Sequence, residues 1–182
     1  GVSRLFGTTY AIIPDMIEAG TYMMAAAVND GSHVEIRNVI PKHLESITAK
    51  LIEMGVEIKE EEDSLIVEKN GRLSKVNVKT LPYPGFPTDM QPQIATVFAF
   101  SDGTSIVTEG VWDSRFRYVD QLTLMGADIQ VDGKTAVITG VDALNPAPVK
   151  AVDLRAGAAM LIAGLATDGI TEIEEIERID RG

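Results

Sequence analysis

The acidic and basic side chains that could do chemistry centre on one proline-rich segment, residues 83–93. This segment contains three prolines and one glycine, and Asp89 is its single carboxylate. Because proline fixes φ and drives the preceding residue out of the α region, residues 81–87 cannot be helical, and Asp89 is the first plausible cap of a helix. The segment therefore predicts a rigid turn that aims one carboxylate. That carboxylate either caps the helix or acts as an acid or base.

Three arginines are candidates for binding an anionic substrate, because guanidinium groups match carboxylate and phosphate oxygens. They are Arg115, Arg155 and Arg181. Arg155 lies two residues after Asp153, in the first turn of an expected helix, where the helix macrodipole disfavours a cation and attracts an anion. An arginine at that point indicates an anion nearby. The alternative is that all three are ordinary surface cations.

The sequence offers little for metal or thiol chemistry. It has no cysteine, which excludes disulfides and thiolate metal sites, and its two histidines are His33 and His43. His33 follows an Asp-Gly turn and His43 follows Pro41 at a helix start, so both fit solvated or capping roles. We expect neither a metal nor an organic cofactor.

Charge and hydropathy exclude two further classes of protein. A net charge of −11 with 16 scattered basic residues argues against a nucleic-acid surface. No run of eighteen apolar residues and no basic leader is present, so we expect a cytoplasmic protein without a membrane partner. The apolar content of 45% is enough for a sizeable core.

Aspartate and glycine recur in a pattern that indicates three repeats. Asp15, Asp89 and Asp153 are each followed, after an apolar stretch of helical length, by an Asp-Gly pair. The small residues in these stretches predict helices packed closely between other elements. Extended runs are expected before each first aspartate and after each glycine, at residues 9–13, 75–79 and 149–152, and at residues 34–39, 104–108 and 170–176.

In the first two repeats a second helix is expected to end at a Met-Gly pair, with Gly55 and Gly126 as left-handed caps. Two strands follow, joined by residues 60–63 in the first repeat. In the second, Asp132-Gly133 predicts a type I′ turn. The fold class is thus α/β, with β-α-β-α-β-β units at about residues 8–70, 74–140 and 147–182. The third unit is truncated, because its Met-Gly pair would fall about 23 residues after Gly169.

Several short runs of the sequence resemble one enzyme family. They are residues 13–15, 18–21, 83–93, 114–116, 153–156 and 179–182. Together they resemble the UDP-N-acetylglucosamine 1-carboxyvinyltransferases, and the likeness extends over the whole chain. The proline-rich segment separates this family from its sister, 3-phosphoshikimate 1-carboxyvinyltransferase. The resemblance implies that residues 1–182 are a single, incomplete domain of a two-domain transferase. That domain is an inside-out α/β barrel, and the active site lies between the two domains.

The resemblance also implies a reaction. Members of this family transfer enolpyruvyl from phosphoenolpyruvate to the 3′-hydroxyl of UDP-N-acetylglucosamine, the first committed step of peptidoglycan synthesis. By similarity Asp89 is the base and contacts the sugar nucleotide, as does the backbone near Val111. Arg115, Arg155 and Arg181 would face phosphoenolpyruvate and phosphate. Trp112 either borders the cleft or packs in the core.

The family's catalytic cysteine has no counterpart in this chain, and its Lys-Asn pair and a further arginine lie outside it. The chain alone is therefore expected to be inactive and to need the missing second domain. Two alternatives stay open: an enzyme of the 3-phosphoshikimate type, and a non-catalytic repeat scaffold or binding module.

Overall fold

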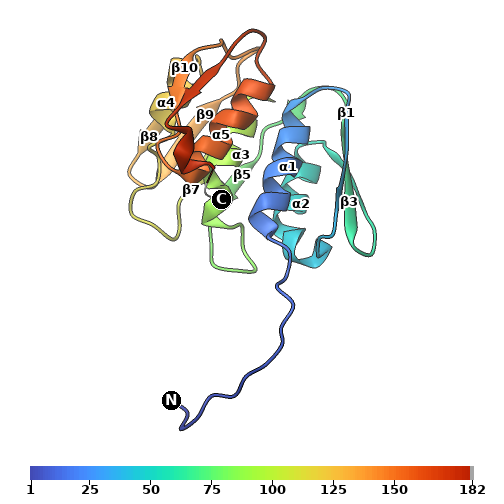
Figure 1. The fold of residues 1–182 in the computed structure, drawn as a ribbon. Coiled ribbons are helices and arrows are strands. Elements are labelled where there is room, and N and C mark those ends of the chain that lie inside the picture. Colours follow the sequence, from blue (N-terminus) through green and yellow to red (C-terminus); the bar gives the residue numbers. More distant parts are fainter. Residues whose placement is uncertain (181–182) are drawn as a thin grey trace.

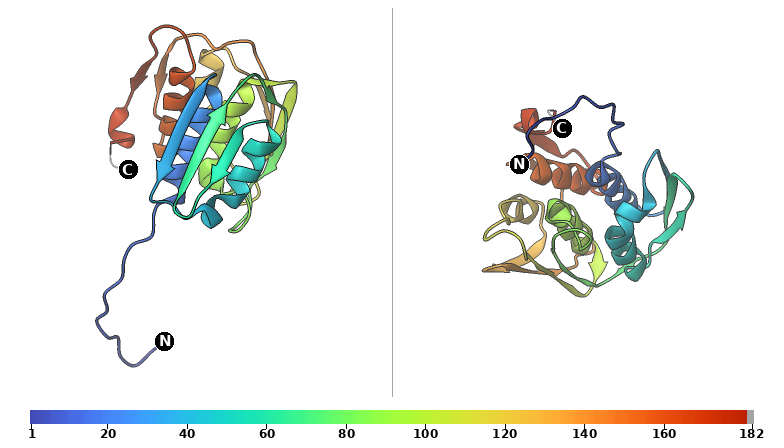
Figure 2. Two further views of the ribbon diagram at one scale, coloured as in Figure 1. Left: turned by 90° about the vertical axis from the view of Figure 1, so that its right-hand side faces the viewer. Right: turned by 90° about the horizontal axis from the view of Figure 1, so that it is seen from below.

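The computed structural model describes residues 1–180 of the chain, and its centre is a group of helices. The first helices of the three repeats are α1 (Met16–Val28), α3 (Gln91–Ala99) and α5 (Leu154–Leu165), and each contacts the other two. Figures 1 and 2 show them side by side, with the strands on the outside. This is the expected inside-out arrangement of an α/β fold, although the described strands form separate sheets and no closed barrel.

Close packing explains the small residues of the central helices. Every residue of α3 is buried. In α1, a Cβ added at Gly20 would lie 2.8 Å from Ile47 Cδ1 and 3.0 Å from Met90 Cε, so a larger residue would have to displace the ends of these side chains. The expected packing role of the small residues is therefore confirmed in α1.

The first repeat places a three-stranded sheet beside α1. After α1 come β1 (Ser32–Arg37), α2 (Glu45–Glu53), β2 (Glu57–Glu60) and β3 (Ser64–Lys69), in the sheet order β1-β3-β2. Gly55 follows α2 with φ +98°, as its capping role requires.

The second repeat contains a four-stranded sheet in the order β5-β7-β9-β8. Its elements are β4 (Leu73–Ser74), β5 (Asn77–Lys79), α3, β6 (Ser101–Asp102), β7 (Thr104–Thr108), α4 (Val119–Leu124), β8 (Asp128–Asp132) and β9 (Thr135–Thr139). The third repeat adds β10 (Pro148–Lys150) and β11 (Glu172–Glu174), which pair in parallel.

Two expectations about strands and turns were wrong. Residues 9–13 form no strand: they are exposed and belong to an extended segment that leads away from the body (Figure 1). Their counterparts β5 and β10 each pair with a parallel neighbour, whereas residues 9–13 have no such partner, and an isolated strand has little stability. The β8–β9 hairpin pairs Asp132 with Thr135, so Gly133 and Lys134 are its central residues. Only Gly133 has positive φ, which is the pattern of a type II′ turn.

Within residues 1–180, no helix is long and apolar enough to cross a bilayer. The same residues contain no group of three or more acidic or histidine side chains placed to hold a metal ion.

Candidate functional site

Asp89 does not cap a helix, unlike the aspartates at the matching positions of the other repeats. Asp15 Oδ1 accepts the N–H of Ile17 at 2.7 Å, and Asp153 Oδ1 accepts the N–H of Ala156 at 2.8 Å. In the second repeat, Thr88–Met90 form a 3₁₀ turn and α3 begins only at Gln91, with no side-chain cap. The prediction that Asp89 caps this helix was therefore wrong, since α3 begins one residue later than a cap at Asp89 would place it, and the Asp89 carboxylate is left for other contacts.

Two arginines hold the Asp89 carboxylate, one at each oxygen. Arg115 Nη2 lies 2.7 Å from Oδ1, and Arg155 Nη2 lies 3.1 Å from Oδ2. Arg155 comes from the first turn of α5, so the anion that the sequence indicated beside it is the Asp89 carboxylate. The side chains of Arg115, Arg155 and Asp89 are 23%, 25% and 38% exposed, so the cluster is partly accessible to solvent.

The charges around Asp89 decide its protonation. Partial burial disfavours its ionised form, but the hydrogen bonds and charges of Arg115 and Arg155 outweigh burial and lower the pKa of Asp89 below its ordinary value. With both arginines in place, Asp89 is an ionised carboxylate and a weak base.

Val111 and Trp112 lie on the loop that follows β7. Both backbone N–H groups donate to Glu109 Oε1, at 2.8 Å from Val111 and 3.1 Å from Trp112. The N–H of Val111 is thus engaged, so a substrate contact through this backbone would use its carbonyl oxygen. The Trp112 side chain is 56% exposed and is not a core residue.

Glu109 is a buried carboxylate that the sequence reasoning missed. It is 1% exposed and also accepts the hydroxyls of Thr80 at 2.7 Å and Thr88 at 2.9 Å. Burial opposes ionisation of Glu109, but these hydrogen bonds outweigh burial and lower its pKa. An acidic residue directly after a strand and before Gly110 is the only signal that the sequence offered.

Three further residues from the sequence analysis are not seen in this cluster: Arg181, His33 and His43. Arg181 falls outside the described residues. His33 is exposed beside Glu68, and His43 lies in the 3₁₀ turn Pro41–Leu44, so neither is near Asp89 in any described contact.

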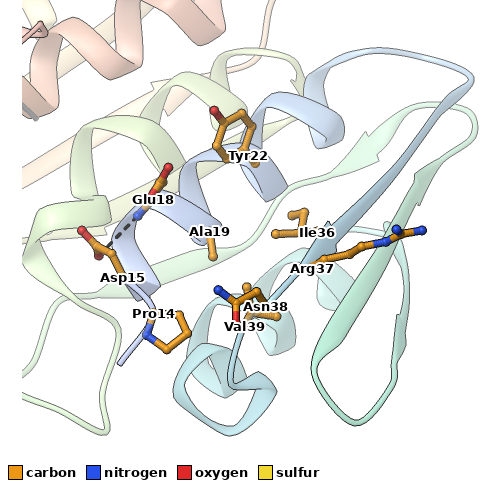
Figure 3. Close-up of a pocket in the computed structure, with 9 residues that line it drawn as sticks. All are labelled: Pro14, Asp15, Glu18, Ala19, Tyr22, Ile36, Arg37, Asn38 and Val39. Atoms are coloured by element: carbon orange, nitrogen blue, oxygen red, sulfur yellow. Dashed lines mark hydrogen bonds between the residues drawn. The ribbon is translucent and has the colours of Figure 1, made fainter. Parts of the chain in front are cut away.

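Of the pockets that adjoin α1, one includes a candidate site residue. A pocket of about 290 Å³ lies between the start of α1 and the end of β1, and Figure 3 shows Asp15 in it, bonded to the Glu18 N–H. None of the candidate site residues lines that pocket. A second pocket, of about 370 Å³, runs between α1 and α5 and has Arg155 in its wall.

Comparison with known proteins places the chain in a family. A family model described as EPSP synthase (3-phosphoshikimate 1-carboxyvinyltransferase) matches residues 1–182. UDP-N-acetylglucosamine 1-carboxyvinyltransferase of Clostridium botulinum is 59% identical over 182 residues, and the chain covers 43% of that protein's length. The protein of the same name from Desulfofundulus thermocisternus is 51% identical over 183 residues, with 75% of its length covered. The chain belongs to the UDP-N-acetylglucosamine 1-carboxyvinyltransferase family.

Solved structures support the fold of this carboxyvinyltransferase family. The enolpyruvyl transferase NikO from Streptomyces tendae superposes with a TM-score of 0.84 at 26% identity, over 94% of this chain and 41% of that one. EPSP synthase from Acinetobacter baumannii superposes with a TM-score of 0.76 at 22% identity, over 98% of this chain and 45% of that one, which shows the fold alone.

Proposed function

We propose that the chain is part of an enzyme that transfers enolpyruvyl from phosphoenolpyruvate to the 3′-hydroxyl of UDP-N-acetylglucosamine. The observation that carries this proposal is that Asp89, alone among the three equivalent aspartates, is free of a capping bond and lies against Arg115 and Arg155. A carboxylate and two guanidinium groups are the groups needed to deprotonate an alcohol beside an anionic substrate.

The proposed reaction is an addition followed by an elimination. Asp89 takes the proton of the sugar 3′-hydroxyl as the oxygen attacks C2 of phosphoenolpyruvate. C3 gains a proton from an acid of the full-length protein outside this chain, the role that the resemblance gives to the family's cysteine, and a tetrahedral intermediate results. Loss of inorganic phosphate and of one C3 proton then regenerates the double bond. Arg115, Arg155 and Arg181 would stabilise the charge that grows on phosphate as the intermediate collapses.

Binding of phosphoenolpyruvate would also activate the base. The carboxylate and phosphate of this substrate compete with Asp89 for the guanidinium groups of Arg115 and Arg155. A bound anion would therefore raise the pKa of Asp89 and make it a stronger base. Carbon NMR of the Asp89 carboxyl group is expected to report this rise when phosphoenolpyruvate is added, and an unchanged pKa would contradict the step.

The proposal also covers the sugar-nucleotide contact, the second domain and the cellular location of the enzyme. The backbone at Val111 would contact the sugar nucleotide, and the second domain of the same polypeptide would supply the groups that this chain lacks, so the chain alone would be inactive. The first relatives agree with a missing partner domain, because the chain spans 43% of their length. We place the enzyme in the cytoplasm, at the start of peptidoglycan synthesis, with no metal or organic cofactor.

A second candidate follows from the family model, whose description names 3-phosphoshikimate as the acceptor. The test is phosphate release from phosphoenolpyruvate by the full-length protein that contains this chain. We expect release with UDP-N-acetylglucosamine and none with shikimate 3-phosphate. The reverse result would favour the second candidate, and release with neither acceptor would favour a non-catalytic scaffold.

A further inference from the structure

The buried carboxylate of Glu109 connects the loop at Val111 with the segment that carries Asp89. Its Oε1 accepts the N–H groups of Val111 and Trp112, while its Oε2 accepts the hydroxyl of Thr88, the residue before Asp89. An ionised carboxylate can only accept hydrogen bonds, so Thr88 must direct its proton toward Glu109. The Thr88 oxygen is then left as an acceptor for Arg115 Nη1, at 3.1 Å.

We propose that Glu109 is a positioning residue that sets both the substrate loop at Val111 and the Arg115–Asp89 pair. The inference rests on the proposed function and deepens it, because it assigns a role in that same site to a residue that touches no substrate. Thr80 completes the arrangement: its hydroxyl donates to Glu109 and accepts the N–H of Gly110 at 2.8 Å.

Burial makes this arrangement rigid. Glu109 is 1% exposed and Thr80 is fully buried, so water cannot replace a lost partner without the loop moving. Glu109 also donates its backbone N–H to Lys134 O at 2.7 Å, which fixes the residue to the β8–β9 hairpin. A charge-assisted network on a rigid sheet is the kind of support that holds a reactive pair in one geometry.

The network has two arms, which predict different kinetic effects. One arm runs from Glu109 through Thr88 to Arg115, and the other runs from Glu109 to the backbone of Val111 and Trp112. Thr88→Val removes the contact with Arg115 and leaves the Val111 loop bonded, so it should lower kcat with little change in KM for UDP-N-acetylglucosamine. Glu109→Gln loses the charge on both arms, so it should lower kcat and raise this KM, with kcat/KM falling about 10- to 100-fold. Glu109→Asp keeps the charge and should recover part of the loss.

The experiment measures kcat and both KM values in the full-length protein, beside unfolding by urea. The matched control is Ser101→Ala, which removes a buried hydrogen bond to Phe98 O (2.8 Å) at the far end of α3. This variant should lose stability and keep wild-type kinetics.

The outcomes separate the inference from the proposed function. If the wild type releases phosphate and folded Glu109→Gln keeps wild-type kcat and KM, the positioning role is wrong and Glu109 is only structural. If Glu109→Gln does not fold, Thr88→Val decides, and wild-type kcat in that variant overturns the inference. A wild type that releases no phosphate with UDP-N-acetylglucosamine refutes the proposed function, and the positioning role with it.

Discussion

Arg155 Nη2 lies 3.1 Å from Asp89 Oδ2, which ties the first turn of α5 to the 3₁₀ turn before α3. This ion pair links the second and third repeats at the candidate site, in addition to the packing of α3 against α5. A cation in the first turn of a helix is ordinarily unfavourable, and here a carboxylate from another repeat compensates for it.

Removing Arg155 should change the acidity of its partner. In Arg155→Met the pKa of Asp89 should rise toward the unperturbed value of about 3.9, because one of two neighbouring cations is lost. Carbon NMR of the carboxyl group measures this pKa. Arg72→Met, which breaks a pair with Asp102 at the other end of α3, should leave it unchanged. An equal pKa in wild type and Arg155→Met would show that the ion pair is absent in solution.

The three equivalent aspartates should differ in what they contribute to stability. Asp15→Ala and Asp153→Ala each remove a cap, and each should lower the free energy of unfolding by about 1 kcal/mol. Asp89→Ala should cost less, because no helix depends on it and the freed arginines are partly hydrated. Urea unfolding of the purified chain compares the three. A cost for Asp89→Ala equal to the other two would contradict the absence of a cap.

The repeat pattern of the sequence located most of the fold because helix caps and strand periods are local signals. Gly55 and Gly126, for example, take the left-handed conformation that a helix end requires, and β7 spans the predicted residues 104–108. The strand predicted at residues 9–13 is absent because a strand also needs a neighbouring strand to pair with, and no local sequence pattern reports whether one is present. The turn type predicted at Gly133 was wrong because the register of β8 and β9 decides which two residues are the central residues of the turn.

The candidate site was less predictable than the fold. Asp89, Arg115 and Arg155 came from local sequence features and the resemblance, but the contact of Arg155 with Asp89 depends on how α5 packs against α3. The contact of Arg115 with Asp89 depends on the path of the loop after β7. Glu109 was missed because its importance lies in four hydrogen bonds, two from the loop after β7, one from Thr88 in a 3₁₀ turn and one from Thr80 beside β5. Nothing in the sequence shows that its side chain is buried.

Ionisation of Glu109 should make stability depend on pH. Its pKa in the folded state lies below the unfolded value of about 4.3, so its contribution is complete above that value and is lost as pH falls through the lower folded pKa. The difference in unfolding free energy between wild type and Glu109→Gln should therefore be larger at pH 6 than at pH 3. Urea unfolding at both values measures it, and an equal difference would mean that Glu109 is not ionised in the fold.

Gly110 has no room for a side chain. A Cβ there would lie 2.2 Å from Thr80 O, so Gly110→Ala must displace the loop and weaken the bonds of Val111 and Trp112 to Glu109. In the full-length protein the KM for UDP-N-acetylglucosamine should rise about tenfold or more. Gly7→Ala, where a Cβ meets nothing within 4 Å, should match the wild type. An unchanged KM in Gly110→Ala would argue against a substrate contact at this loop.

The most direct measurement is phosphate release from phosphoenolpyruvate by the full-length protein, with UDP-N-acetylglucosamine as acceptor, in wild type and in Asp89→Ala and Asp89→Asn. Because a positioned base contributes about 10²- to 10⁴-fold, both variants should lose at least about 100-fold in kcat while circular dichroism shows the fold retained. Turnover in either variant at the wild-type rate would contradict the assignment of Asp89 as the base.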